Sequence, residues 1–306
     1  ADILRGAFDA GINYFDTARM YTDSEEKIGR ALGSARDRII IATKTAAPDG
    51  GELRRQLETS LRLLRTDHID VYQFHNPERV PVPDDGSGLY EAMLEARQAG
   101  KIRFIGITNH RINTAVEAVR SGLYDTMQFP FSYISDEKET ALVRACEETD
   151  TGFIAMKALC GGLLNDIETA VAFMNTHGNV VPIWGIQTME ELLKLKAAAR
   201  NENGPTSEQA ARIAADRAGL QGNFCRSCGY CLPCPAGIAI FNCARMSLLL
   251  RRSLPAQWLT EQWQREMEKI NDCEDCGHCR EHCPYGIDTP ALLKKNYADY
   301  QTFLKE

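Results

Sequence analysis

Residues 13–44 read NYFDTARMYTDSEEKIGRALGSARDRIIIATK and contain a strand, a helix and a second strand in that order. The apolar runs at 13–18 and 38–44 are rich in Ile, Phe and Tyr and have the length of strands. SEEKIGRAL (24–32) lies between them and has the composition of a helix. A buried strand followed by a helix and another buried strand predicts a parallel sheet with helical cover.

The same alternation continues to about residue 188. Seven strands are predicted, each followed by a helix: NYFDTA (13–18), RIIIATK (38–44), IDVYQFH (69–75), RFIGITN (103–109), TMQFPF (126–131), FIAMKAL (153–159) and NVVPIWG (179–185). A (β/α)8 TIM barrel has eight strands. Because ADILRGAFDAG at the start is predicted as a helix closed by Gly11, we expect the first strand of the barrel to lie before residue 1. An open seven-stranded sheet with two unpaired edges is the alternative.

Cysteines decide the remainder of the chain. CRSCGYCLPCP (225–235) and CEDCGHCREHCP (273–284) hold eight of the 11 cysteines. The second run matches the C-x2-C-x2-C-x3-C-P pattern of bacterial ferredoxins, and the first is one residue shorter between its third and fourth cysteines. In that pattern the fourth cysteine of each run ligates the cluster of the other run. We therefore predict two [4Fe-4S] clusters. The expected ligands are Cys225, Cys228, Cys231 and Cys283 for one, and Cys273, Cys276, Cys279 and Cys234 for the other.

Three alternatives to this ligand set stay open. A zinc site uses two separated C-x2-C pairs, whereas each run here is an unbroken ladder of cysteines. Disulfides are typical of small secreted domains, and the chain shows no apolar signal segment. Cys243 is nine residues after Cys234 and could replace it as a ligand if the short spacing misplaces that sulfur.

Composition limits the class of protein. Of the 306 residues 44% are hydrophobic and 25% charged, as in a globular protein. A formal net charge of −7 argues against nucleic acid as a partner, and no run has the 18 or more apolar residues of a membrane span. NGPTS (203–207) has the composition of a linker, so we predict a barrel domain over 1–203 and an α-helical ferredoxin-like domain over 204–306. Reduced, cluster-bearing cysteines predict a cytoplasmic protein.

Four polar residues occur at or after the predicted strands of the first half. Asp16 belongs to the first strand, Tyr21 follows it, Lys44 ends the second strand and His75 ends the third. In a (β/α)8 barrel the carboxyl ends of the strands carry the catalytic residues. Taken singly, each has a structural explanation, such as a helix cap, a solvated strand end or a core histidine. Together they predict one site.

The four residue types also suit one reaction. A tyrosine has an ordinary pKa near 10, and a nearby lysine cation lowers it. Asp16 would keep Lys44 charged and oriented, while His75 would donate a hydrogen bond to a bound carbonyl oxygen. Such a site could protonate a carbonyl oxygen while a nicotinamide supplies hydride.

The motifs GINYFDTARMYTDSEEKIGRAL, IATK, DVYQFH and FIGITNH resemble the aldo/keto reductase family over residues 1 to about 195. The resemblance implies that Asp16, Tyr21, Lys44 and His75 form the catalytic tetrad. It also implies that the nicotinamide carboxamide is held by Thr108, Asn109 and Gln128. The tail resembles the iron–sulfur module of one bacterial and archaeal branch of that family.

The nucleotide contacts differ from the pattern of many family members. Where those place a basic residue and an Asn for NADP, this chain has GIQTMEELLKL, with Gln187 and Glu191. A carboxylate repels a phosphate and can pair with a ribose hydroxyl, which favours NADH over NADPH. Gly161 and Gly162 in CGGLL could approach a pyrophosphate or form a plain tight turn.

The resemblance implies an NAD(P)H-dependent oxidoreductase that reduces an aldehyde or ketone, with Tyr21 as the proton donor. Its two clusters would exchange electrons with a partner protein or only stabilise the tail. The alternative is an iron–sulfur electron-transfer or docking protein whose barrel is inactive.

Overall fold

The computed structural model describes residues 1–220 and 224–305. They form two compact units: residues 1–158 with 171–205, and residues 159–170 with 206–306. The sequence predicted a division after residue 203, and the segment 159–170 was assigned to the barrel. In the structure this short segment is grouped with the second unit.

The first unit contains a parallel sheet in which each strand pairs with the next along the chain. The strands are β1 (Tyr14–Asp16), β2 (Ile40–Thr45), β3 (Ile69–His75), β4 (Ile102–Thr108), β5 (Thr126–Pro130), β6 (Gly152–Met156) and β7 (Val180–Pro182). All seven predicted strands therefore form. Among the described residues β7 does not pair with β1, and an eighth strand is not present. The strand expected before residue 1 stays a prediction.

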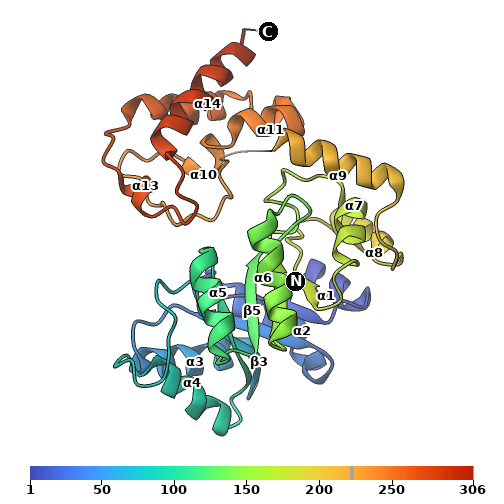
Figure 1. Cartoon of the computed structure of the whole chain (residues 1–306), viewed down its shortest axis with the longest axis vertical. Helices are drawn as coiled ribbons and strands as arrows, with labels where there is room; N and C mark the ends of the chain where they lie inside the picture. Colours follow the sequence, from blue (N-terminus) through green and yellow to red (C-terminus); the bar gives the residue numbers. More distant parts are fainter. Residues whose placement is uncertain (221–223, 306) are drawn as a thin grey trace. The chain divides into compact units, whose positions relative to one another are not determined.

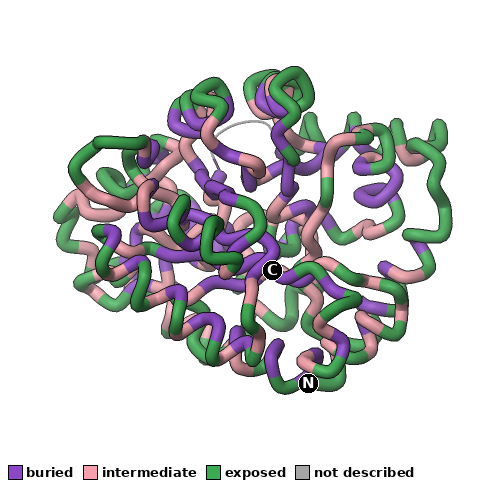
Figure 2. The backbone as a smooth tube through the Cα atoms, turned by 90° about the horizontal axis from the view of Figure 1, so that it is seen from below, coloured by how far each residue is buried: buried purple, intermediate pink, exposed green. Residues whose placement is uncertain are grey.

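Helices connect the strands (Figure 1). They are α1 (Asp2–Asp9), α2 (Ser24–Leu32), α3 (Gly50–Leu64), α4 (Leu89–Gln98), α5 (Ile112–Ser121), α6 (Glu137–Glu148), α7 (Ile167–Met174) and α8 (Met189–Ala198), with a short 3-10 helix η1 (Gly33–Arg38) before β2. Helix α3 shows why they cover the sheet. Its Leu53, Leu57, Leu61 and Leu64 recur at helical spacing and are all buried. Figure 2 shows this alternation of buried and exposed stretches along the backbone.

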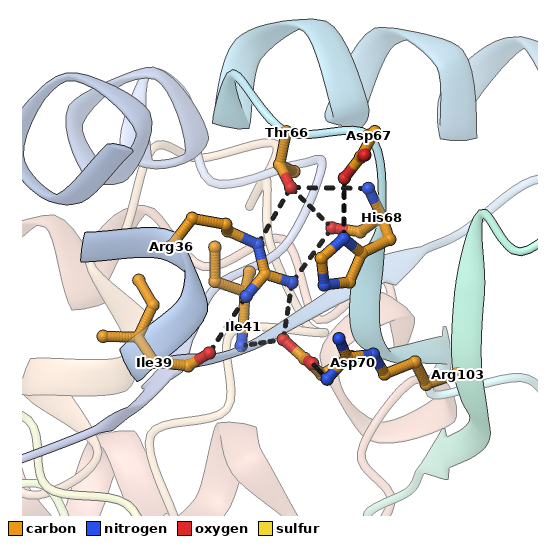
Figure 3. A network of polar contacts seen from close by, with 8 residues as sticks. All are labelled: Arg36, Ile39, Ile41, Thr66, Asp67, His68, Asp70 and Arg103. Carbon is orange, nitrogen blue, oxygen red and sulfur yellow. Dashed lines mark hydrogen bonds and ion pairs between the residues drawn. The ribbon is translucent and has the colours of Figure 1, made fainter. Parts of the chain in front are cut away.

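The amino ends of β2, β3 and β4 are tied together by a buried carboxylate (Figure 3). The Asp70 side chain is 4% exposed and accepts hydrogen bonds from Arg36 Nη2 at 2.7 Å, Arg103 Nη1 at 2.8 Å and the backbone N–H of Ile41 at 2.9 Å. Arg36 also donates to the carbonyl oxygens of Ile39 and His68. This end of the sheet lies opposite the carboxyl ends of the strands, so we assign the network to stability.

The second unit is helical. Its elements are α9 (Ser207–Gly219), α10 (Ile240–Cys243), α11 (Met246–Arg252), η2 (Pro255–Gln257), α12 (Glu261–Glu268), η3 (Lys269–Asp272), α13 (His278–Glu281) and α14 (Thr289–Phe303). Met246, Met267 and Leu293 are each at most 1% exposed and form part of a small apolar core. Asn296 braces that core, donating to the carbonyl oxygen of Cys243 at 2.9 Å and accepting from Ser247 Oγ at 3.0 Å. In the described parts of the chain, no helix is both long and apolar enough to cross a bilayer.

Candidate functional site

An ion pair lies at the carboxyl ends of the first strands. Lys44 is 1% exposed, and its Nζ donates to Asp16 Oδ2 at 2.5 Å and to the carbonyl oxygen of Thr17 at 2.6 Å. Asp16 ends β1, as predicted, whereas Lys44 is followed by one more residue of β2. Burial lowers the pKa of Lys44 and raises the pKa of Asp16, and the attraction between the two charges opposes both shifts. Each member therefore depends on the other to stay ionised.

Tyr21 and His75 lie beside this pair. Their rings meet edge to face, with centroids 5.6 Å apart and an interplanar angle of 85°. Lys44 Nζ is 5.5 Å from the centroid of the Tyr21 ring. His75 ends β3, and its buried Nδ1 has no hydrogen-bond partner within the described residues. Burial, followed by the charge of Lys44, lowers the pKa of His75 to about 4. The imidazole is therefore neutral at pH 7 and can donate from one nitrogen.

The expectation about the tyrosine needs a correction. The sequence argument expects Lys44 to lower the pKa of Tyr21. In the structure burial and then the negative charge of Asp16 raise the pKa of Tyr21 to about 12. Lys44, which is paired with Asp16, does not outweigh these two effects. Tyr21 is also 45% exposed, so we expect water to screen part of the shift.

The three residues expected to hold the carboxamide are close to the same network. Gln128 on β5 accepts a hydrogen bond from Gln73 at 3.0 Å, and Gln73 also donates to Asp16 at 3.4 Å. Thr108 ends β4, and its hydroxyl oxygen accepts from a backbone N–H at 3.2 Å, which leaves its own proton to donate. Asn109 follows it and donates to the carbonyl oxygen of Pro77 at 2.9 Å. The Thr108 hydroxyl and the side-chain amides of Asn109 and Gln128 can therefore each contribute one more hydrogen bond.

The predicted turn at Gly161 and Gly162 belongs to the second unit. Both glycines have positive φ, 64° and 88°, which favours glycine. The guanidinium of Arg245 occupies one side of the turn, because its Nη1 donates to the carbonyl oxygens of Cys160 at 3.2 Å and Gly161 at 3.0 Å. The turn therefore already binds a side chain from elsewhere in the sequence, that of Arg245.

Gln187 and Glu191 take part in a helix cap. Glu191 Oε2 accepts from the backbone N–H groups of Gln187 at 2.7 Å and Thr188 at 3.1 Å, while the Thr188 hydroxyl accepts from the Glu191 N–H. This is a capping box at the start of α8. One oxygen of the Glu191 carboxylate, Oε2, is thus used by the cap.

The thiols of the tail gather in two sets. Cys231, Cys234, Cys273, Cys276 and Cys279 line one pocket of about 400 Å3, a volume that includes space open to solvent. Burial raises the pKa of Cys279, and its thiol neighbours Cys273, Cys234 and Cys276 add to the shift. The fourth cysteine of the first run therefore lies with the first three of the second run.

Cys283 of the second run lies near thiols of the first run. Burial raises the pKa of Cys225, and the nearby thiols of Cys228 and Cys283 contribute to that rise. Burial also raises the pKa of Cys231 to about 12, with contributions from Cys225, Cys228 and, from the other set, Cys279. No disulfide bond joins the cysteines of the two runs among the described residues.

The two cysteine runs have positive backbone φ angles at three matched positions. Positive φ angles occur two and four residues after the first cysteine of each run and three residues after the last. The matched pairs are Ser227 and Asp275, Gly229 and Gly277, and Gly237 and Gly286. The sequence signal for the last pair is the repeat C-P-x-G-I at 234–238 and 283–287. The shared turns indicate that both runs wrap similar groups.

Single-metal coordination and substitution by Cys243 fit the structure less well. Among the described residues no three His, Cys, Asp or Glu side chains converge closely enough for one metal ion. Zinc–sulfur bonds of about 2.3 Å would require such convergence, whereas a cubane separates its ligands by its own width. Cys243 is fully buried in the apolar core, where its Sγ lies 3.8 Å from the carbonyl oxygen of Glu266.

Two supporting residues in the first unit were not predicted. Gln73 precedes His75 by two residues and so shares its face of β3, a period that could have identified it. Glu25 is 2% exposed and accepts from Thr43 Oγ1 and Ser60 Oγ, both at 2.7 Å, and pairs with Arg19. A carboxylate so well satisfied fixes the segment between β1 and α2, on which Tyr21 lies.

The sequence of this chain is similar to those of known proteins in both of its parts. The family model described as the aldo/keto reductase family matches residues 1–220, and the model described as a 4Fe-4S dicluster domain matches residues 224–288. Aldo-keto reductase YhdN of Bacillus subtilis (strain 168) is 33% identical over 178 residues, which are 53% of this chain and 53% of that protein. D-threo-aldose 1-dehydrogenase of a Pseudomonas species is 26% identical over 239 residues, covering 66% of this chain and 71% of the relative.

A solved structure extends the similarity. The aldo-keto reductase from Klebsiella pneumoniae in complex with NADPH aligns with a TM-score of 0.61 at 25% identity, over 71% of this chain and 84% of that one. The chain spans about half the length of the first curated relative and 58% of another, an uncharacterized Bacillus subtilis oxidoreductase named YrpG. On the family match to most of its length, this chain belongs to the aldo/keto reductase family of oxidoreductases and carries a 4Fe-4S dicluster domain after the parallel sheet.

Proposed function

We propose that the chain reduces the carbonyl group of a small aldehyde or ketone with a reduced nicotinamide dinucleotide, and that its tail holds two [4Fe-4S] clusters. One observation carries the first part. Lys44 pairs with Asp16 at 2.5 Å and lies 5.5 Å from the ring of Tyr21, which in turn meets His75 at 5.6 Å. The phenol of Tyr21, the neutral imidazole of His75 and the buried cation of Lys44 thus lie close together, an arrangement that suits proton transfer to a carbonyl oxygen.

Tyr21 is the proton donor in this proposal. With a pKa of about 12 it is a weak acid in the resting site, so the proton stays on the phenol at neutral pH. An oxygen that gains negative charge during reduction is a stronger base than a phenolate, and the proton then moves from Tyr21 Oη to it. The exposure of the residue, 45%, leaves the hydroxyl accessible to a substrate.

The other three residues position and polarise. His75, with its pKa lowered to about 4, is neutral and donates one hydrogen bond to the carbonyl oxygen without competing as an acid. Lys44 favours the phenolate left after transfer, because opposite charges within a few ångströms attract strongly in a buried site. Asp16 keeps that lysine protonated and fixed against the carbonyl oxygen of Thr17.

The nicotinamide would be held by Thr108, Asn109 and Gln128, whose side chains keep unused hydrogen-bonding capacity. When bound, the reduced nicotinamide supplies a hydride to the carbonyl carbon. The Klebsiella pneumoniae neighbour was solved in complex with NADPH. We retain NADH as the preferred cofactor, because the segment at Gln187 and Glu191 offers a carboxylate where a 2′-phosphate would need a cation.

The clusters would be held by the two crossed thiol sets. Cys225, Cys228, Cys231 and Cys283 form one, and Cys234, Cys273, Cys276 and Cys279 form the other. The crossed grouping is supported by the thiols that line one pocket and by the mutual effects of the thiols on their pKa values. Such clusters would carry single electrons and exchange them with a partner protein, and thiols kept reduced in this way suit a cytoplasmic protein.

Replacement of Tyr21 by Phe tests the proton-donor assignment. The variant keeps the ring against His75 and removes only the hydroxyl. We expect kcat/KM for 4-nitrobenzaldehyde or methylglyoxal to fall by at least about 10²-fold, with dinucleotide binding unchanged by fluorescence titration. Carbonyl reduction at the rate of the unmodified protein would remove Tyr21 from the reaction.

A further inference from the structure

One buried cation in the tail has no anionic side chain beside it. Arg245 immediately precedes α11 and is 5% exposed. Its Nε donates to the carbonyl oxygen of Phe241 at 3.1 Å, and its Nη1 donates to the carbonyl oxygens of Cys160 and Gly161. Within the described ranges, 1–220 and 224–305, no carboxylate forms an ion pair with it. Carbonyl dipoles compensate a buried charge only in part, so an anion is expected nearby.

The ionisable neighbours of the guanidinium are thiols. Burial lowers the pKa of Arg245, and the charges of Cys225 and Cys160 oppose that shift. Conversely, burial raises the pKa of Cys225 while Arg245 acts to lower it. The glycine turn confirms the proximity. A Cβ added to Gly161 would lie 2.9 Å from Arg245 Nη1 and 3.6 Å from Cβ of Ser227, a residue inside the first cysteine run.

We propose that Arg245 is the counter-ion of the cluster held by Cys225, Cys228, Cys231 and Cys283, and that it raises the reduction potential of that cluster. A cubane with four thiolate ligands carries a net negative charge, and it gains one further charge when it accepts an electron. A fixed cation beside one ligand stabilises the reduced form more than the oxidised form. This inference rests on the proposed ligand set.

The guanidinium is fixed by backbone carbonyls, which makes the effect specific to one site. Its partners at Cys160 and Gly161 belong to the loop between β6 and α7. Gly161 has φ of 64°, so a side chain there would be strained and would also push against the guanidinium. We therefore expect the cation to stay in place when the charge of the cluster changes.

Arg252, the last residue of α11, provides a matched control. Its Nε donates to the carbonyl oxygen of Leu163 at 2.8 Å, so it anchors the same loop. Unlike Arg245, it forms an ion pair with a carboxylate, that of Asp216. Its charge is already compensated, and removing it should affect the loop without changing a cluster potential.

The test is an EPR-monitored titration of the full chain, purified anaerobically, with dithionite as the source of electrons. The variants are Arg245→Gln, Arg245→Lys and Arg252→Gln. In Arg245→Gln one cluster should become about tenfold harder to reduce at a fixed potential, a shift of about 59 mV for a one-electron couple. The second cluster, in the same molecule, should be unchanged. Arg245→Lys and Arg252→Gln should titrate like the unmodified protein.

Three results with the variants would overturn the proposal. Both clusters could titrate unchanged in Arg245→Gln, or Arg252→Gln could shift a potential equally. Arg245→Gln and Arg252→Gln could also lose the same amount of iron, which would make the arginine only an anchor of the loop. Loss of about half the iron in Arg245→Gln alone, with retention in Arg245→Lys, would support the counter-ion role. Unmodified protein without iron would refute the proposed ligand sets, and the role of Arg245 with them.

Discussion

The buried pair of Lys44 and Asp16 gives a prediction that separates stability from catalysis. Lys44 is 1% exposed and Asp16 10% exposed as side chains. Asp16→Asn keeps the shape of the side chain and leaves the ammonium with the carbonyl oxygen of Thr17 as its remaining partner. Lys44→Met leaves the carboxylate without its cation. Removing one member of a buried ion pair costs about 3–5 kcal/mol of stability, because the other charge stays buried and unpaired.

The double variant should behave differently. Replacing a whole buried pair by neutral groups of similar size is roughly neutral for stability. Asp16→Asn combined with Lys44→Met should therefore be more stable than either single variant, with a coupling free energy of about 3 kcal/mol or more. It should nevertheless stay inactive, because the cation that favours the phenolate of Tyr21 is absent. We expect a loss in kcat/KM of at least about 10²-fold for the Lys44→Met and double variants.

Hydrogen exchange of peptides from β2 and β3 is the assay for stability. Two compact units make a single global unfolding transition an unsafe measure, whereas exchange reports the free energy of opening for these strands alone. Single variants within about 1 kcal/mol of the unmodified protein would show that the pair is not a buried ion pair. Costs that simply add in the double variant would refute the coupling. Full activity in the double variant would refute the role of Lys44.

Three further predictions concern pH, the sheet and the clusters. The folded pKa of His75, about 4, lies below its ordinary value of 6.5, so the stability that the neutral ring contributes is complete above pH 6.5 and is lost as pH falls to about 4. In a series of denaturation measurements against pH, His75→Gln should flatten this acid-side loss of stability. A loss of stability unchanged in the variant would contradict the assignment. Asp70→Asn should destabilise the sheet by about 3–5 kcal/mol, measured as faster hydrogen exchange in β3. The control Asp67→Asn, at a side chain that is 93% exposed, should change the stability of the sheet by less than about 0.5 kcal/mol. Equal effects of the two variants would show that the network does not stabilise the sheet. Cys234→Ser should lower the iron content from about eight to about four atoms per chain, and Cys243→Ser should leave it at about eight. Iron lost in Cys243→Ser and kept in Cys234→Ser would make Cys243 the ligand.

The regular parts of the fold could be predicted because their signals are local. All seven strands follow apolar runs, and β3 coincides with the predicted IDVYQFH. Strand ends were less accurate. The run FIAMKAL predicts a strand to residue 159, but β6 ends at Met156 because Lys157 adopts φ of 57°. Such a turn depends on the surrounding structure rather than on the apolar pattern.

The site illustrates the same division. The strand-end positions of Asp16 and His75 follow from sequence spacing, since parallel strands bring their carboxyl ends to one edge. The raised pKa of Tyr21 could not be predicted, because it depends on which groups are buried around it. Gly161 was expected to approach a pyrophosphate or to form a plain tight turn, and its carbonyl oxygen accepts a hydrogen bond from Arg245, which lies 84 residues away in the sequence. The only local signal for that arginine is a charge inside an apolar helical stretch.

Direct hydride transfer is the central claim, and isotope transfer tests it. The full chain would be incubated anaerobically with 4-nitrobenzaldehyde and NADH or NADPH carrying deuterium at C4, in each of the two stereochemical forms. We predict that one form gives alcohol with deuterium at the former carbonyl carbon, and that Tyr21→Phe forms this product far more slowly. Alcohol that contains only solvent hydrogen at that carbon with both forms would contradict the account, because the electrons would then have reached the substrate by another route.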